Sequence, residues 1–178
     1  VYLSQVPGIC MSKIKESNHF ARIVVPDDSR IRPIRDVEAY WRLFAHASPG
    51  DLLGEASPTY LEDPGAAASI HAVSPHARIV VSLRDPVDLM YSFYLMLLRN
   101  DGAMSFMEEI RRKLATTEGV NWKRIELRLE YGYFYEGLKR YIDLFGADRV
   151  KVVIYEELAR DTGRVVQEVL DFLQVPYP

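Results

Sequence analysis

An arginine and a serine that suit a phosphate ligand stand eight residues apart in the most apolar region of this 178-residue chain. The stretch VVSLRDPVDLMYSFYLMLL (residues 80–98) places Arg84 and Asp85 where an apolar, β-branched run gives way to a helical one. Asp85 can cap a helix by accepting its free N–H groups, and Pro86 suits the first helical position. The helix N-terminus adds a partial positive charge, and Arg84 adds a full charge with a fork of donors. Together they predict a compact anion site, for which phosphate is the natural ligand.

Ser92 stands two helical turns beyond this corner. A hydroxyl in an apolar helix needs a partner if it is buried. It could bind the same anion, or it could donate back to the carbonyl four residues earlier. Arg84 has an alternative role as well, because it could pair with a carboxylate in the core. The local pattern leaves these alternatives open.

The elements around this corner alternate between strands and helices. Residues 77–83 and 149–158 are apolar runs typical of strands buried on both faces, and residues 51–61 indicate a strand that runs into a loop. Residues 1–6 indicate the end of a helix that Pro7 and Gly8 terminate. Further helices are expected at 36–46 with Asp36 as its cap, 64–73, 86–98, 105–115, 131–146 ending on Gly146, and 161–173 capped by Asp161 or Thr162.

This alternation favours an α/β fold, a three-layer sandwich with a central parallel β-sheet between two layers of helices. The length fits a single domain over residues 1–178. Ligands of such sheets bind at the carboxyl ends of the strands. Arg84 stands at that end of the strand 77–83, so the predicted anion site lies where the fold would bind a ligand.

Composition narrows the function classes. The chain is 48% hydrophobic and 26% charged with a net charge of −3, so nothing in its overall charge attracts nucleic acid or an anionic membrane. The single cysteine excludes an intrachain disulfide, and no spacing of histidine, cysteine or carboxylate indicates a metal. No run reaches the roughly 18 apolar residues of a membrane helix. We therefore expect a cytoplasmic protein without a metal site.

Four motifs, in order along the chain, resemble those of the sulfotransferases that use 3′-phosphoadenosine 5′-phosphosulfate (PAPS). RIVVSLRDPVDLMYSFY resembles the family's 3′-phosphate-binding segment, in which a strand ends in Arg-Asp-Pro and a serine follows eight residues after the arginine. GEASPTYL (54–61) resembles its Gly-Glu-x-[Ser/Thr]-Pro-x-Tyr segment. Residues 1–20 resemble the stretch with its Lys-Glu-x-x-x-Phe motif, and residues 135–176 resemble its C-terminal strand–Glu–Leu–helix unit.

The resemblance implies the P-loop-containing nucleotide hydrolase-like fold of sulfotransferases and transfer of a sulfuryl group from PAPS, with adenosine 3′,5′-bisphosphate (PAP) as product. It implies that Arg84 and Ser92 bind the 3′-phosphate of this co-substrate. It makes Glu16 the base that takes the proton of an acceptor hydroxyl or amine. His19 is the second candidate for the base, although a packing or hydrogen-bonding role is favoured for it. The implied partner is a small-molecule or carbohydrate acceptor, not nucleic acid.

The chain also departs from the family pattern. The family's first strand and its lysine-bearing phosphosulfate loop are expected to precede Val1, and no GxxxxGK[ST] motif occurs in the sequence. Ala56 stands where some polysaccharide-modifying members have a lysine, Leu89 where many have a second arginine, and Phe134 where many have a tyrosine. The alternative function is therefore a non-catalytic scaffold or binding domain with the same fold.

Overall fold

The computed structural model of the chain describes residues 2–22, 32–101, 104–115 and 129–176. Its strands are β1 (Ile9–Met11), β2 (Leu52–Gly54), β3 (Ile79–Leu83) and β4 (Val150–Ile154). Its helices are α1 (Val37–Arg42), α2 (Thr59–Glu62), α3 (Ala66–Val73), α4 (Pro86–Asp101), α5 (Phe106–Ala115), α6 (Phe134–Phe145), α7 (Tyr155–Arg160) and α8 (Thr162–Leu173). Short 3₁₀ turns form η1 (Leu3–Gln5), η2 (Leu129–Gly132) and η3 (Ala147–Arg149).

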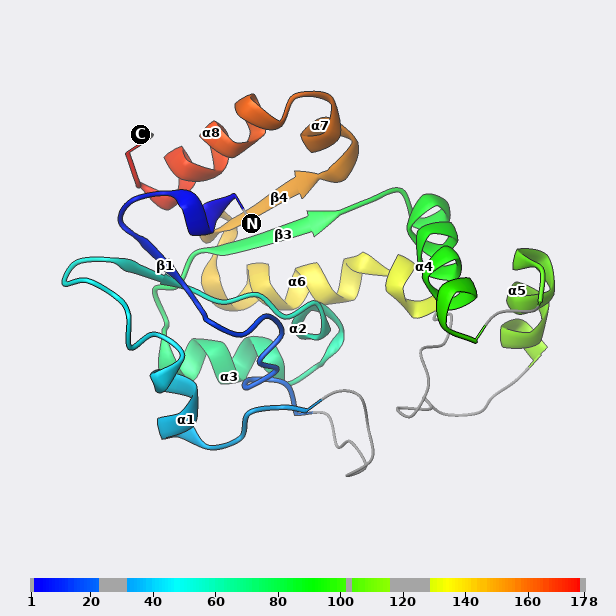
Figure 1. The fold of residues 1–178 in the computed structure, drawn as a ribbon, viewed down its shortest axis with the longest axis horizontal. Coiled ribbons are helices and arrows are strands. Elements are labelled where there is room, and N and C mark those ends of the chain that lie inside the picture. Colours follow the sequence, from blue (N-terminus) through cyan, green and yellow to red (C-terminus); the bar gives the residue numbers. More distant parts are fainter. Residues whose placement is uncertain (1, 23–31, 102–103, 116–128, 177–178) are drawn as a thin grey trace.

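Helices cover both faces of the parallel pair β3–β4, which gives the three layers that the sequence predicts (Figure 1). The register pairs Ile79 with Val150 and Leu83 with Ile154, so both strands end at the same level. One face packs against α3 and α6 in a cluster that contains Ala67, Ile79, Tyr141, Phe145 and Val150. The other face packs against α8 in a cluster that contains Val153, Val165 and Val169. The α/β fold with parallel strands is confirmed.

The strands β1 and β2 form a second parallel pair, with Ile9 opposite Leu52. Among the described residues the four strands form two separate two-stranded sheets, so β2 and β3 each pair with one neighbour only. Helix α8 connects the two pairs, because its buried Leu170 packs against Ile9 while other residues of the same helix pack against β4.

Two expectations about the strands were wrong. The strand at 77–83 is not buried on both faces: Val80 is 38% exposed and Ser82 is exposed, because the described part of α8 packs over β4 and not over this side of β3. The strand at 149–158 is not buried on both faces either, since Val152 is 37% and Ile154 40% exposed. It is also shorter than expected, because β4 ends at Ile154 and α7 follows at once. The β-branched run ends there, and the next residues, Tyr-Glu-Glu-Leu-Ala-Arg, include several strong helix formers.

The predicted helix ends are confirmed where a side chain or a glycine defines them. The carboxylate of Asp36 accepts a hydrogen bond from the Ala39 N–H, and that of Asp161 accepts one from the Arg164 N–H. Gly146 ends α6 with a φ of 85°, and its N–H donates to the Ile142 carbonyl. The helix expected at 1–6 is present only as the single turn η1.

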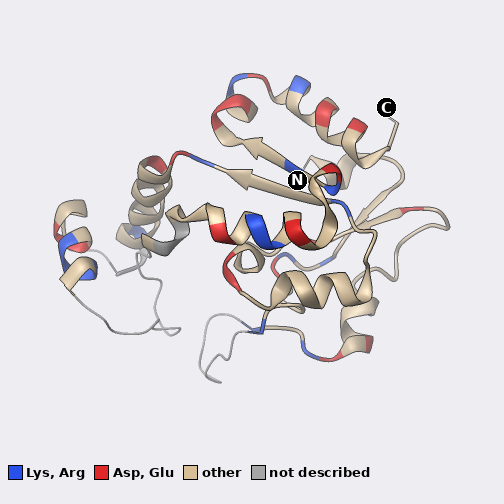
Figure 2. Cartoon of the chain, turned by 180° about the vertical axis from the view of Figure 1, so that it is seen from behind, with Lys and Arg blue, Asp and Glu red and all other residues tan. Residues whose placement is uncertain are grey.

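None of the helices in the described ranges is long and apolar enough to cross a membrane. In Figure 2 acidic and basic residues alternate along α6, whereas α8 carries a basic residue near its start and acidic residues further on. Neither helix therefore presents a continuous basic stripe to an anion.

Candidate functional site

The corner between β3 and α4 has the structure that its sequence predicts. Oδ1 of Asp85 accepts hydrogen bonds from the backbone N–H groups of Val87 (2.9 Å) and Asp88 (3.1 Å), so Asp85 caps α4. Pro86 is the first residue of that helix. The Asp85 N–H in turn donates to Oε1 of Glu156, 3.1 Å away, which ties the corner to the residues that follow β4.

Arg84 has no carboxylate partner among the described residues, which argues against the core ion pair that the sequence left open. Its guanidinium lies over the ring of Tyr155, 4.7 Å from the ring centre. The register explains this contact, since the residues preceding them, Leu83 and Ile154, are paired. The Nε atom is buried and has no hydrogen-bond partner in the described part of the chain. Stacking thus orients the guanidinium and leaves its donors available for an anion.

Ser92 is exposed on α4, six residues after Pro86 and therefore about 9 Å further along the helix axis. Within the described ranges its hydroxyl makes no hydrogen bond, so it does not bond back to the preceding turn. No hydrogen bond joins it to Arg84. Its share in an anion site stays a prediction.

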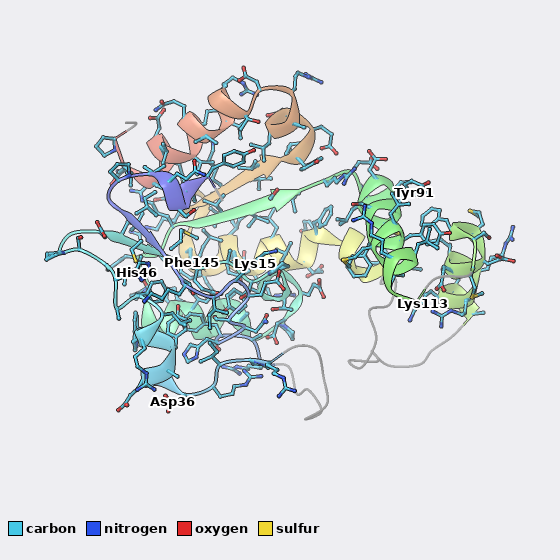
Figure 3. The ribbon with its side chains drawn as sticks, viewed as in Figure 1. Lys15, Asp36, His46, Tyr91, Lys113 and Phe145 are labelled. Carbon is cyan, nitrogen blue, oxygen red and sulfur yellow. The ribbon has the colours of Figure 1, made fainter. Side chains whose placement is uncertain are left out.

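Glu16 lies in an unusual backbone conformation after the end of β1. Its φ is 60° and that of Asn18 is 50°, both in the left-handed region that non-glycine residues seldom adopt. The Glu16 carboxylate is 45% exposed and pairs with the Lys15 ammonium, Nζ to Oε1 3.0 Å. Figure 3 labels Lys15 near the middle of the molecule, below β3. Strained residues of this kind concentrate at functional sites, and the role of Glu16 as base stays a prediction.

A second segment, residues 54–60, lies beside Glu16. The Glu16 N–H donates to the Ala56 carbonyl (3.2 Å), and the Asn18 N–H donates to Oγ of Ser57 (3.0 Å). Oε1 of Glu55 accepts from the hydroxyls of Ser17 (3.0 Å) and Ser57 (2.6 Å). Both segments resemble motifs of the family, but nothing in the sequence alone singles out Glu55, Ser57 or Ser17.

Two tyrosines close this polar cluster. The Tyr60 hydroxyl is 3.5 Å from Oγ of Ser17 and accepts a hydrogen bond from the Phe20 N–H. Burial raises the pKa of Tyr60, and burial with the nearby negative charge of Glu55 raises the pKa of Tyr40. Both side chains therefore stay neutral at physiological pH and act as hydrogen-bonding and packing groups.

His19 packs into the protein, as the sequence analysis favoured. Its Nδ1 is 2.6 Å from the Ile34 carbonyl oxygen, so this nitrogen carries the proton and donates it. The ring stacks on Tyr40 with 4.1 Å between ring centres. These contacts fix the imidazole, whereas the Glu16 carboxylate is accessible.

Three of the four strands are followed directly by a polar residue at their carboxyl ends: Glu55 after β2, Arg84 after β3 and Tyr155 after β4. Glu16 lies five residues after the end of β1. The structure joins Arg84 to Tyr155 and joins the Glu16 segment to Glu55, but no hydrogen bond or ion pair links these two groups among the described residues. No three histidine, cysteine or carboxylate side chains of the described chain come together as metal ligands.

Comparison with known proteins gives one consistent result. The profile of the Sulfotransferase family matches residues 13–178. The crystal structure of a sulfotransferase from Alicyclobacillus acidocaldarius superposes with a TM-score of 0.83 and 35% identity, covering 98% of this chain and 74% of that one. A sulfotransferase domain from the curacin biosynthetic pathway, at 19% identity and a TM-score of 0.51, shares the fold over 79% of this chain and 44% of that one.

Curated relatives are more distant and longer. The bifunctional heparan sulfate N-deacetylase/N-sulfotransferase 1 of Caenorhabditis briggsae is 24% identical over 150 residues, which are 80% of this chain and 17% of that protein. Human heparan sulfate glucosamine 3-O-sulfotransferase 6 is 28% identical over 145 residues, 78% of this chain and 40% of that protein. The chain thus spans less than half the length of these relatives.

Proposed function

Since this chain belongs to the sulfotransferase family, we propose that it transfers a sulfuryl group from PAPS to a hydroxyl or amine of an acceptor and releases PAP. The donor supplies an activated sulfate whose leaving group is a phosphate. The chain's residues must then bind the nucleotide, orient the acceptor and accept its proton. We assign binding of the 3′-phosphate and acceptance of the proton to described residues.

The observation that carries the proposal is the unpaired guanidinium of Arg84 at the carboxyl end of β3. A buried cationic group is costly unless an anion or hydrogen-bond acceptors compensate it. Arg84 instead lies over Tyr155 beside the capped N-terminus of α4, and its Nε is buried without a partner in the described chain. An anion with several oxygens, such as the 3′-phosphate of PAPS, satisfies such a fork of donors and also interacts favourably with the helix N-terminus. In this proposal Ser92 adds a hydroxyl to the same phosphate.

Glu16 is proposed as the general base. Its carboxylate is accessible, and its left-handed backbone is held by hydrogen bonds to residues that follow β2. It would take the proton of the acceptor while the acceptor oxygen or nitrogen forms the bond to sulfur and the bond from sulfur to the phosphate oxygen breaks. The Lys15 ammonium pairs with this carboxylate, Nζ to Oε1 3.0 Å.

A carbohydrate is the acceptor class that the relatives favour, because their names specify heparan sulfate and carbohydrate substrates. Ala56 is exposed, and its carbonyl bonds the Glu16 N–H, so it lies beside the proposed base. The resemblance puts a lysine here in some polysaccharide-modifying members, and alanine removes that positive charge. With the net charge of −3, this favours a neutral or weakly charged sugar over a highly sulfated glycan.

The lysine-bearing phosphosulfate loop stays a prediction from the resemblance, and with it the alternative of a non-catalytic sulfotransferase-like binding domain. The two functions differ in turnover. The enzyme transfers label from [³⁵S]PAPS to a member of a panel of mono- and oligosaccharides, and Glu16→Gln lowers the rate by about 100-fold or more. A binding domain binds PAP without transfer to any of them.

The first test is a thermal shift of the chain with PAP, using AMP and ADP as controls. At 100 times its dissociation constant PAP adds about 2.7 kcal/mol of stability, or roughly 5 to 11 °C in Tm for a protein of this size. We expect Arg84→Ala to abolish the shift. Arg99→Ala, also on α4 but about 20 Å from its N-terminus, is the matched control and should leave it intact. Equal shifts with PAP and AMP, or a full shift in Arg84→Ala, would contradict the assignment of the 3′-phosphate site.

A further inference from the structure

The turn that carries Glu16 is strained on both sides of a buried serine. Glu16 and Asn18 both have positive φ, while Ser17 between them is only 1% exposed. Asparagine tolerates this conformation well, and here its Nδ2 donates to the Glu16 carbonyl, 2.7 Å away. Glutamate has no such compensation. The surroundings must therefore hold Glu16 in place.

One carboxylate, that of Glu55, organises those surroundings. Its Oε1 accepts hydrogen bonds from the hydroxyls of both Ser17 and Ser57. Each hydroxyl in turn accepts a backbone N–H from the strained segment: Ser57 Oγ from Asn18 (3.0 Å) and Ser17 Oγ from His19 (3.4 Å). Each hydroxyl donates its proton to Glu55, so its oxygen is oriented to accept a hydrogen bond from the backbone amide. Two hydrogen-bond relays therefore lead from one carboxylate to the consecutive amides of Asn18 and His19, two and three residues after Glu16.

Glu55 is half-buried, and no lysine or arginine of the described chain pairs with it. Its Oε1 accepts from the two hydroxyls, and its charge is near enough to Tyr40 and Tyr60 to contribute to the raised pKa of both. A half-buried carboxylate without a cation is unfavourable unless its hydrogen bonds compensate it. The two hydroxyls therefore require a hydrogen-bond acceptor at position 55.

We propose that Glu55 is a positioning residue for Glu16: through the hydroxyls of Ser17 and Ser57 it holds the left-handed turn that presents the Glu16 carboxylate to solvent. The inference rests on the proposed function only for the role of Glu16 as base. The claim that Glu55 holds the turn at residues 16–18 does not depend on catalysis. A competing role, in which Glu55 is itself the base, requires its charge and not merely its acceptor oxygen.

Amide hydrogen exchange tests the proposal without knowledge of the acceptor. The reporters are the amides of Glu16, Asn18 and Phe20, which donate to residues 56, 57 and 60, and the amides of α8 report global unfolding. In Glu55→Ala two buried hydroxyls lose their acceptor. We expect the three reporter amides to exchange about 5-fold to 100-fold faster through local opening, while the α8 amides keep their rates.

Two further variants complete the test. Glu55→Gln keeps an amide oxygen that can accept from both hydroxyls, so its reporter amides should stay within about threefold of the parent chain. Glu38→Ala is the matched control, because this glutamate is 87% exposed on α1 and its ion pair with Arg42 is long at 4.0 Å. Glu38→Ala should leave the exchange rates of all three reporter amides unchanged.

Three outcomes would overturn the positioning role: unchanged reporter amides in Glu55→Ala, equal acceleration of the reporter and α8 amides, or equally fast exchange in Glu55→Gln and Glu55→Ala. The PAP thermal shift of Glu55→Ala separates this result from the proposed function. We expect it to match the parent chain, since Arg84 lies on a different strand pair. If the parent chain shows no PAP shift, the donor assignment fails while the exchange result still decides the role of Glu55.

Discussion

Replacing Gly137 by alanine should destabilise the protein, although the same change stabilises most helices. Gly137 lies in α6 where that helix meets the end of α2, and a Cβ atom there would be 2.4 Å from the Leu61 carbonyl oxygen. The same carbonyl accepts a hydrogen bond from Arg140, and the Tyr141 hydroxyl donates to the Tyr60 carbonyl. Helix α6 thus anchors the segment that begins with Glu55, so this contact supports the candidate site as well as the core.

The size of the effect follows from two opposing terms. Alanine in a helix interior is favoured over glycine by about 1 kcal/mol. Overpacking a close contact costs about 1 to 3 kcal/mol, and a backbone oxygen at 2.4 Å cannot move aside like a flexible side chain. The upper end of that range applies, which leaves a net loss of about 2 kcal/mol. For a chain of this size that lowers Tm by roughly 4 to 8 °C.

Gly163 in α8 is the matched control. The nearest atom to a Cβ at this position is Oδ1 of Asp161 at 3.8 Å, an ordinary contact. Gly163→Ala should therefore gain up to about 1 kcal/mol and raise Tm by up to about 4 °C. Thermal unfolding followed by circular dichroism at 222 nm measures both variants. A Tm of Gly137→Ala equal to or above that of the parent chain would refute the close-contact argument.

Two other predictions concern the cap and the buried tyrosines. Asp85→Ala removes the acceptor for two N–H groups of α4 and should cost about 1 to 2 kcal/mol, whereas Asp85→Asn should keep most of the stability, both measured by thermal unfolding. Burial raises the pKa of Tyr40, Tyr60 and Tyr141 above the usual value near about 10. The unfolded chain therefore ionises first, and stability should fall as pH rises above about 10. Urea unfolding between pH 9 and 11 measures this slope, which Tyr141→Phe should reduce; an equal slope would contradict the assignment.

The sequence predicted the parts of the fold that depend on near neighbours. Asp36, Asp85 and Asp161 each cap a helix by accepting an N–H two or three residues ahead, so a short stretch of sequence contains both partners. Gly146 ends α6 because glycine tolerates its positive φ. The parallel α/β architecture also followed, since apolar runs alternate with amphipathic ones.

Burial and long-range side-chain contacts were not predictable in this way. Val80 belongs to an apolar run, and its exposure depends on where α8 packs along the β3–β4 pair. Tyr155, directly after β4, lies under the guanidinium of Arg84, a contact between residues 71 positions apart. The hydrophobic periodicity of one segment does not indicate which distant segment will pack against it.

Long-range pairing also explains why the sequence alone did not indicate a role for Glu55. The fold makes the candidate site recognisable. Ser17 and Glu55 are 38 positions apart, and only the pairing of β1 with β2 brings their segments together. Where they meet, a glutamate adopts a left-handed backbone, and at the end of β3 an arginine lacks a carboxylate partner in the described chain. Neither arrangement is favourable by local energetics, and neither stabilises the core. Local preference and tertiary structure therefore disagree at the two residues that we propose as base and phosphate ligand, and such disagreement is typical of functional sites.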